Sequence, residues 1–154
     1  MENVAREDRK GFVRTMVRVM ASGVFDILHT GHLAYLQQAR SYGDELIVVV
    51  ACDNTVRRKK HEPITPESMR VKLVDNLKPV DHAILGKDGD IFETVRKIEP
   101  DVIVLGFDQG FDEKDLENEL SKRGMGGIKV VRAKECAEDL NATRRIIAKI
   151  RSNN

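Results

Sequence analysis

The chain has 154 residues, of which 41% are hydrophobic and 33% are charged, and its formal net charge is +1 at pH 7. A chain of this length forms one compact domain whose core needs no disulfide or metal. The near-neutral charge disfavours a dedicated nucleic-acid or membrane surface, and no apolar run approaches the roughly 18 residues of a membrane-spanning helix. These totals predict a soluble, globular protein.

The N-terminus and the cysteines bear on domain organisation and location. The first fifteen residues are charged and lack the apolar centre of a secretion signal. We expect residues 1–15 to form a flexible arm and residues 16–154 to form a single domain. Cys52 and Cys136 lie far apart in the sequence and form no metal-type pair, which fits a reducing, cytoplasmic environment.

Apolar runs alternate with helical patterns along the rest of the chain. Strands are predicted at 17–23, 45–51, 82–85, 101–106 and 128–133. Helices are predicted at 31–43, 65–80, 90–100, 112–124 and 141–151. The strands at 45–51 and 101–106 are almost continuously apolar, which is typical of strands covered on both faces.

Three of the helices carry more detailed expectations. The first is predicted to bury one side and to stop at Gly43; that side consists of Leu33, Leu36 and Ala39. In the second, Thr65 is a plausible cap and Pro66 takes the first helical position. Its buried stripe is predicted to be Met69, Leu73 and Leu77. Asn141 is a possible cap of the last helix.

A strand–helix alternation through the whole chain predicts an α/β fold, a Rossmann-like, doubly wound, parallel five-stranded sheet with helices on both faces. In such sheets ligands bind at the carboxyl ends of the strands, near the point where the strand order reverses. The chemistry is therefore expected in three segments, 22–32, 52–61 and 106–111, which follow the first, second and fourth strands.

The first of these segments contains the stretch "GVFDILHTGH", residues 23–32. Gly23 lets the chain leave the strand, and Gly31 permits close backbone approach at a helix start. The N-terminus of that helix offers unpaired N–H groups, and His29 and His32 add two imidazole donors at the same end. The combination indicates a phosphate-binding turn, although neither the P-loop pattern nor G-x-G-x-x-G is present.

This stretch resembles the G-x-F-D-x-x-H-x-G-H signature of the cytidylyltransferase-like nucleotidylyltransferases, whose H-x-G-H motif binds a triphosphate. The resemblance covers nearly the whole chain from Val17 onward. "DVIVLGFDQGFDEK" is similar to the family's second signature, and "CDNTVRRKK" to its phosphate-reaching basic segment. "TPESMR" places Arg70 where the family often has an arginine, and "NATRR" replaces a Ser/Thr-rich motif but keeps only Thr143.

Within this superfamily the chain is most similar to the archaeal FAD synthases. Glycerol-3-phosphate cytidylyltransferases are nearby relatives, but they carry a tryptophan where Gln109 stands here. The resemblance implies transfer of a nucleoside monophosphate from an NTP to a phosphate-bearing acceptor, with ATP and FMN as the expected substrates and pyrophosphate as the second product. It also implies Mg²⁺ or another divalent cation with the triphosphate, and a homodimer.

The implied site residues follow the matched motifs. Catalysis is expected from His29, His32 and Lys60. Nucleotide contacts are expected from Gly23, Val24, Phe25, Asp26, His29, Thr30, Gly31, His32, Arg57, Arg70, Gly106, Asp108 and Thr143. Asp26 could help to place Mg²⁺, Asp108 would contact the nucleoside, and any of the residues 57–60 could face the phosphates.

Other interpretations remain open at this point. A CTP-dependent enzyme acting on glycerol phosphate or another sugar or alcohol phosphate fits the same motifs, and so does a silent nucleotide-binding regulatory module. RNA binding through residues 57–60 is disfavoured by the absence of Trp and the small number of other aromatic residues. The two histidines make a poor zinc site without a third ligand. Asp108 could cap a helix, and a surface ion pair could explain Arg70.

Overall fold

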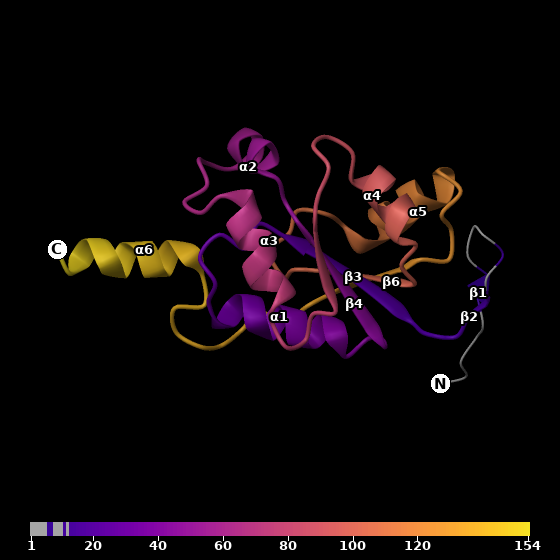
Figure 1. Ribbon diagram of the computed structural model, residues 1–154, viewed down its shortest axis with the longest axis horizontal. Coiled ribbons are helices and arrows are strands. Elements are labelled where there is room, and N and C mark those ends of the chain that lie inside the picture. Colours follow the sequence, from indigo (N-terminus) through magenta and orange to yellow (C-terminus); the bar gives the residue numbers. More distant parts are fainter. Residues whose placement is uncertain (1–5, 8–10, 12) are drawn as a thin grey trace.

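The computed structural model describes residues 6–7, 11 and 13–154 (Figure 1). Its central sheet has five parallel strands in the order β5–β4–β3–β6–β7. The strands are β3 (Arg18–Gly23), β4 (Glu45–Val50), β5 (His82–Leu85), β6 (Val102–Leu105) and β7 (Lys129–Arg132). Each strand lies within its predicted range, and the strand order reverses between β3 and β6. The predicted fold class is therefore confirmed.

Helices cover both faces of this sheet (Figure 1). They are α1 (Thr30–Arg40), α2 (Asp53–Lys59), α3 (Glu67–Asp75), α4 (Ile91–Ile98), α5 (Glu113–Lys122) and α6 (Thr143–Ser152). One core lies between the sheet and α1 with α3, and the other lies between the sheet and α4 with α5. Val19 enters the first core and Met20 the second, because successive side chains of a strand point to opposite faces. Helix α6 extends away from this body and has no buried residue.

Part of the predicted N-terminal arm forms a small hairpin. Strands β1 (Arg6–Glu7) and β2 (Val13–Arg14) pair in antiparallel register. The guanidinium of Arg14 donates to the Glu99 carbonyl, which ties the hairpin to the amino end of the sheet. Residues 1–5, 8–10 and 12 of the arm lie outside the described residues, so its flexibility stays a prediction.

Helix α2 was missed in the sequence, where residues 52–61 were expected to be a loop. It buries only Val56, so it has no apolar stripe that a pattern search could find. Its charges do fit a helix, because Asp53 lies in the first turn and Arg57 and Arg58 lie in the last, where each complements the helix dipole.

The helix predicted at 65–80 is α3, which is shorter than expected and is rotated about its own axis relative to the prediction. It starts at Glu67 with Pro66 in the N-cap position and without a side-chain cap, so the capping role of Thr65 was wrong. Met69 and Leu73 are 46% and 41% exposed, which contradicts the predicted stripe. The buried residues are Arg70 and Val74, one position further along. The reason is Arg70, whose polar partners lie inside the protein and fix the rotation of the helix. Leu77 does pack against the core.

Two further helix boundaries also needed correction. Helix α1 buries Leu36 and Ala39 as predicted, but Leu33 is exposed and the C-cap is Ser41 rather than Gly43. Gly43 is instead needed for packing, since a Cβ there would lie 2.7 Å from the Val17 carbonyl oxygen. The N-cap of α6 is Ala142, because the side chain of the predicted cap, Asn141, donates to the Cys136 carbonyl. None of the helices within the described residues is long and apolar enough to cross a membrane.

Candidate active site

The two histidines of the signature stack on each other at the start of α1. Their ring centroids are 3.7 Å apart and their planes differ by 20°. His29 is the N-cap residue, and its Nδ1 accepts a hydrogen bond of 3.3 Å from the backbone N–H of His32. Because Nδ1 accepts, the proton of the neutral His29 ring lies on Nε2. This ring therefore has one N–H left to offer to an anion.

The ring of Phe25 packs against the ring of His32. The rings of Phe25 and His32 lie 5.2 Å apart at 54°, and Phe25 is only 2% exposed. Its φ of 55° lies in the left-handed region, which costs a residue with a side chain about 1–2 kcal/mol. The surrounding packing must hold the loop in this conformation, so the turn that carries the histidines is fixed before a ligand binds.

Both imidazoles are neutral at pH 7. Burial lowers the pKa of His29, and burial together with the nearby His29 and Lys60 lowers the pKa of His32 to about 3, although Asp26 opposes this shift. Nδ1 of His32 is buried and has no hydrogen-bond partner among the described residues. The pair can therefore offer neutral N–H donors, rather than cations, to an anion in this site.

The depressed pKa of His32 predicts a pH-dependent stability. An unfolded histidine takes up its proton near pH 6.5 but the folded His32 only near pH 3, so the free energy of unfolding falls as the pH falls through this window. Each pH unit within this window lowers the free energy of unfolding by about 1.4 kcal/mol. We expect the wild type to lose about 2 kcal/mol more than His32→Gln between about pH 6.5 and pH 5 in urea unfolding. Equal losses in both proteins would contradict the shift.

The histidines line a cavity of about 290 Å³ at the carboxyl end of β3. Most of the residues predicted from the signatures line it too: Gly23, Val24, Phe25, Asp26, Gly31, Lys60, Gly106, Asp108 and Thr143. Thr30, Arg57 and Arg70 do not line it. Residues 133–136, which follow β7, form part of the wall and were not singled out from the sequence, apart from Cys136.

Gly31 allows the segment before α6 to lie against the histidine turn. A Cβ at this position would lie 2.2 Å from the backbone oxygen of Asn141 and 2.9 Å from the ring of His29. The sequence suggested that Gly31 makes room for a ligand, and in the structure it makes room for the chain itself. Asn141 and Thr143 thereby reach the same cavity as His29.

Gly31→Ala is expected to displace this segment or the His29 ring. A displacement of 1 Å at a reacting centre costs about 100-fold in rate. We therefore expect kcat/KM to fall by about 100-fold while the fold is retained. Gly126→Ala is the matched control, because a Cβ there would meet only the Ser121 hydroxyl at 3.5 Å. Steady-state kinetics with circular dichroism would test both variants, and unchanged kinetics in Gly31→Ala would contradict the steric argument.

A second cavity of about 340 Å³ opens on the other side of the β3 end. Its walls are largely apolar and include Val49, Ala51, Cys52, Val56, Ile91 and Phe111. The loop after β5, with Gly86, Lys87 and Gly89, also lines it, although no sequence motif points to that loop. The two cavities share Ser22, Gly23, Val24, Lys60, Asp108 and Gln109. Two ligands could thus meet at this shared border.

The basic segment contributes its residues unequally. Arg57 pairs with Glu62 at 3.0 Å and lines neither cavity. Arg58, which pairs with Asp88 at 2.8 Å, and Lys59 both line the second cavity. Lys60 lines both, and this position at the border makes it the basic residue best placed to reach phosphates of two ligands.

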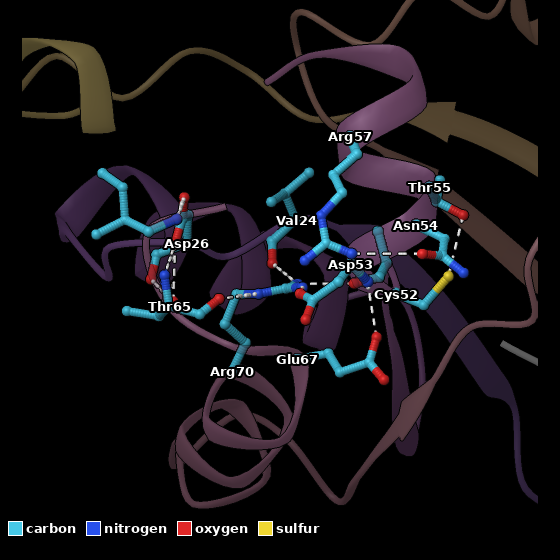
Figure 2. A network of polar contacts seen from close by, with 12 residues as sticks. Val24, Asp26, Cys52, Asp53, Asn54, Thr55, Arg57, Thr65, Glu67 and Arg70 are labelled. Carbon is cyan, nitrogen blue, oxygen red and sulfur yellow. Dashed lines mark hydrogen bonds and ion pairs between the residues drawn. The ribbon is translucent and has the colours of Figure 1, made fainter. Parts of the chain in front are cut away.

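Arg70 joins the loops that follow β3 and β4 (Figure 2). Its side chain is fully buried, and it pairs with Asp53 at 2.7 Å. It also donates to the backbone carbonyls of Val24, Ala51 and Thr65 at 2.7–3.0 Å. These contacts place Arg70 behind the site, as a residue that positions the walls of both cavities. A direct nucleotide contact by Arg70 stays a prediction that this geometry does not support.

Asp26 fixes the loop between α2 and α3 in a similar way (Figure 2). Its carboxylate accepts hydrogen bonds from the backbone N–H groups of Ile64 and Thr65 and from the Thr65 hydroxyl. Burial alone would raise the pKa of Asp26, but these donors and Arg70 outweigh it and lower the pKa. Asp26 is therefore ionised, and three donors already occupy most of its acceptor capacity.

Tyr35 and Gln109, whose roles were not predicted from the sequence, connect the carboxyl ends of β3 and β6, where the strand order reverses. The β3–β6 pairing ends at Ala21, and beyond it the Tyr35 hydroxyl donates to the Val104 carbonyl at 2.6 Å. Gln109 then bridges the gap, donating to the Ser22 carbonyl at 3.0 Å and accepting from Gly106 N–H at 2.9 Å. Side chains thus replace the backbone pairing between the two strand ends, where both cavities begin. Only the tertiary structure reveals these roles.

Known proteins resemble this chain in sequence and in fold. A family model described as "Cytidylyltransferase-like" matches residues 20–148. The chain belongs to the cytidylyltransferase-like family, and with it to the nucleotidyltransferases. Among similar curated proteins, the FAD synthase of Aciduliprofundum boonei is 58% identical over 136 residues, 88% of this chain and 91% of that protein. The FAD synthase of Archaeoglobus profundus is 52% identical over 130 residues, 84% of this chain and 83% of that protein.

A solved structure is similar as well. It is described as the lipopolysaccharide core biosynthesis protein from Thermoplasma volcanium and matches with a TM-score of 0.77 and 50% sequence identity. The match covers 79% of this chain and 98% of that one. At this identity the likeness extends from the fold to the sequence.

Proposed function

We propose that the protein is an FAD synthase, which transfers AMP from ATP to FMN. A phosphate oxygen of FMN attacks the α-phosphorus of ATP, the bond from that phosphorus to the bridging oxygen breaks, and pyrophosphate leaves. The observation that carries this proposal is the pair of cavities that meet at the carboxyl end of β3, with the stacked histidines on one side. The curated FAD synthases that are similar over most of the chain support it.

ATP is assigned to the cavity that contains the histidines. Its triphosphate would lie at the N-terminus of α1, where N–H groups without intrahelical partners and the positive end of the dipole attract anions. The Nε2–H of His29 and the ring of His32 would stabilise the charge that develops around the α-phosphorus. The reaction needs no protein nucleophile, so positioning and charge stabilisation carry the catalysis.

FMN is assigned to the second cavity. Its phosphate would lie at the shared border, beside Lys60, so that it faces the α-phosphorus of ATP. Lys60 would then neutralise charge on both reacting phosphates. This assignment explains why one lysine lines both cavities while Arg57 points to Glu62.

A triphosphate normally carries Mg²⁺, which proteins hold through one or two carboxylates together with the substrate phosphates. No group of three or more His, Cys, Asp or Glu in the described part of the chain could hold a metal ion alone. Asp108 is exposed and lines both cavities, so its carboxylate fits such a shared ion better than Asp26. When bound, the ion would neutralise part of the triphosphate charge.

One experiment tests the proposed function. Purified protein is incubated with Mg²⁺, each NTP in turn, and either FMN or glycerol-3-phosphate, and the products are identified by mass. FAD and pyrophosphate from ATP and FMN alone would support the proposal. A cytidylylated product from CTP would establish the alternative acceptor class, and tight ATP binding without any pyrophosphate would establish a silent module. A cytoplasmic location, expected from the cysteines and the charged N-terminus, and a homodimer, implied by the family resemblance, stay predictions.

A further inference from the structure

The loop between β6 and α5 presents one aromatic ring to each cavity. Phe107 lines the histidine cavity and Phe111 lines the second, and they are 43% and 41% exposed. We infer that Phe111 recognises a planar heteroaromatic ring in the acceptor and thereby selects it over small aliphatic phosphates. This inference rests on the proposed function and adds the residue that determines acceptor specificity.

The loop is held rigidly by two side chains. Gln109 fixes it to the β3 end through the Ser22 carbonyl. From β7, Arg132 donates to the carbonyls of Gly106 and Gln109 at 3.0 and 2.8 Å, and also to that of Phe111. Arg132 in turn pairs with Glu113 of α5 at 2.5 Å. Because the backbone is anchored at Phe111 and at Gly106, next to Phe107, a ligand ring meets a wall that is already ordered.

The rest of the second cavity suits a ring with a phosphate at one end. Apolar side chains line it, among them Cys52, Val56 and Ile91, and Gly89 leaves open space on one side. Its volume of about 340 Å³ lies in the range of about 300–1,000 Å³ that is usual for small-molecule sites.

The basic residues of the second cavity also suit a ligand that carries a phosphate. Arg58 and Lys87 line the same cavity but pair with Asp88 and Glu93, whereas Lys59 and Lys60 form no ion pair with the residues that the structure describes. Cations on a largely apolar cavity match a flavin mononucleotide, which joins a large planar aromatic ring system to a phosphate. Glycerol phosphate would leave the apolar wall and Phe111 without a partner, so only its phosphate would contribute to binding there.

The test measures FMN binding through the fluorescence of the flavin, without ATP. Stacking of a heteroaromatic ring on an aromatic side chain is worth enough to weaken binding about fivefold to 100-fold when the side chain is removed. We expect Phe111→Ala to raise the Kd for FMN at least about tenfold and Phe111→Trp to preserve it. Tyr42→Ala is the matched control, since Tyr42 is 42% exposed and lines neither cavity.

The failure of this inference differs from the failure of the proposed function. If the wild type makes FAD but Phe111→Ala has an unchanged Kd and KM for FMN, the inference is overturned and the function stands. If the wild type makes no FAD, the function fails, and the titration still decides whether Phe111 binds a flavin ring. A loss of FMN binding in both Phe111→Ala and Tyr42→Ala would signal a general defect and would also overturn the inference.

Discussion

His32→Ala is expected to lower kcat by about 100-fold or more, and His29→Ala by a similar factor. Removing one preorganised donor from a developing oxyanion costs about 100- to 1,000-fold in other enzymes. The two imidazoles are half-buried and neutral, and they are stacked beside the helix N-terminus, so water cannot replace either of them with the same geometry. Steady-state pyrophosphate release by both variants is the measurement.

A second variant separates the two roles of His29. This residue also caps α1 through its Nδ1, so His29→Ala removes a cap as well as a donor. His29→Asn keeps an acceptor that is well suited to the N-cap but cannot place an N–H where Nε2 lies. We expect His29→Asn to unfold like the wild type and to be as slow as His29→Ala. Near-wild-type turnover in His29→Asn would show that the histidine serves only the helix.

Arg70→Met is expected to destabilise the protein by about 3 kcal/mol or more. The substitution removes a fully buried cation and leaves three backbone carbonyls and the Asp53 carboxylate, which is 21% exposed, without their donor. Losing one partner of such a pair costs more than the pair contributes, because the groups left behind stay partly desolvated. Urea unfolding gives the free energy directly.

The matched control for this prediction is Arg57→Met. Arg57 lies on the neighbouring α2 and also carries an ion pair, but that pair is exposed and should matter little for stability. A double variant with Asp53→Asn should recover part of the loss in Arg70→Met, since no unpaired charge then remains. If Arg70→Met were as stable as Arg57→Met, the assignment of Arg70 as the residue that joins the loops would fail.

The sequence was informative wherever local pattern and tertiary structure agree. The runs at 45–51 and 101–106 form β4 and β6, the strands on either side of the central β3, because a strand covered on both faces needs apolar residues throughout. The histidine turn could be predicted for a similar reason. Its glycines, its imidazoles and the following helix start are contiguous, so the predicted anion site is contained in ten residues.

What could not be predicted depends on contacts between distant segments. Helix α3 was expected to bury Met69 and Leu73, but the partners of Arg70 come from the loops after β3 and β4 and turn the helix by about one position. The bridging role of Gln109 likewise needs Ser22, which lies 87 residues away. Helix α2 and the second cavity left no periodic signal, since a single buried residue and a polar loop look alike in the sequence.

The shared border between the two cavities has a consequence for turnover. A product made by joining the occupants of both cavities touches every wall that either substrate touched, whereas pyrophosphate touches only one side. FAD formed here would therefore block the binding of both new ATP and new FMN. Its release would require the contacts in both cavities to break. The shared border that brings the two substrates together would thus make release of FAD the slow step of turnover. Accumulated FAD would inhibit its own synthesis.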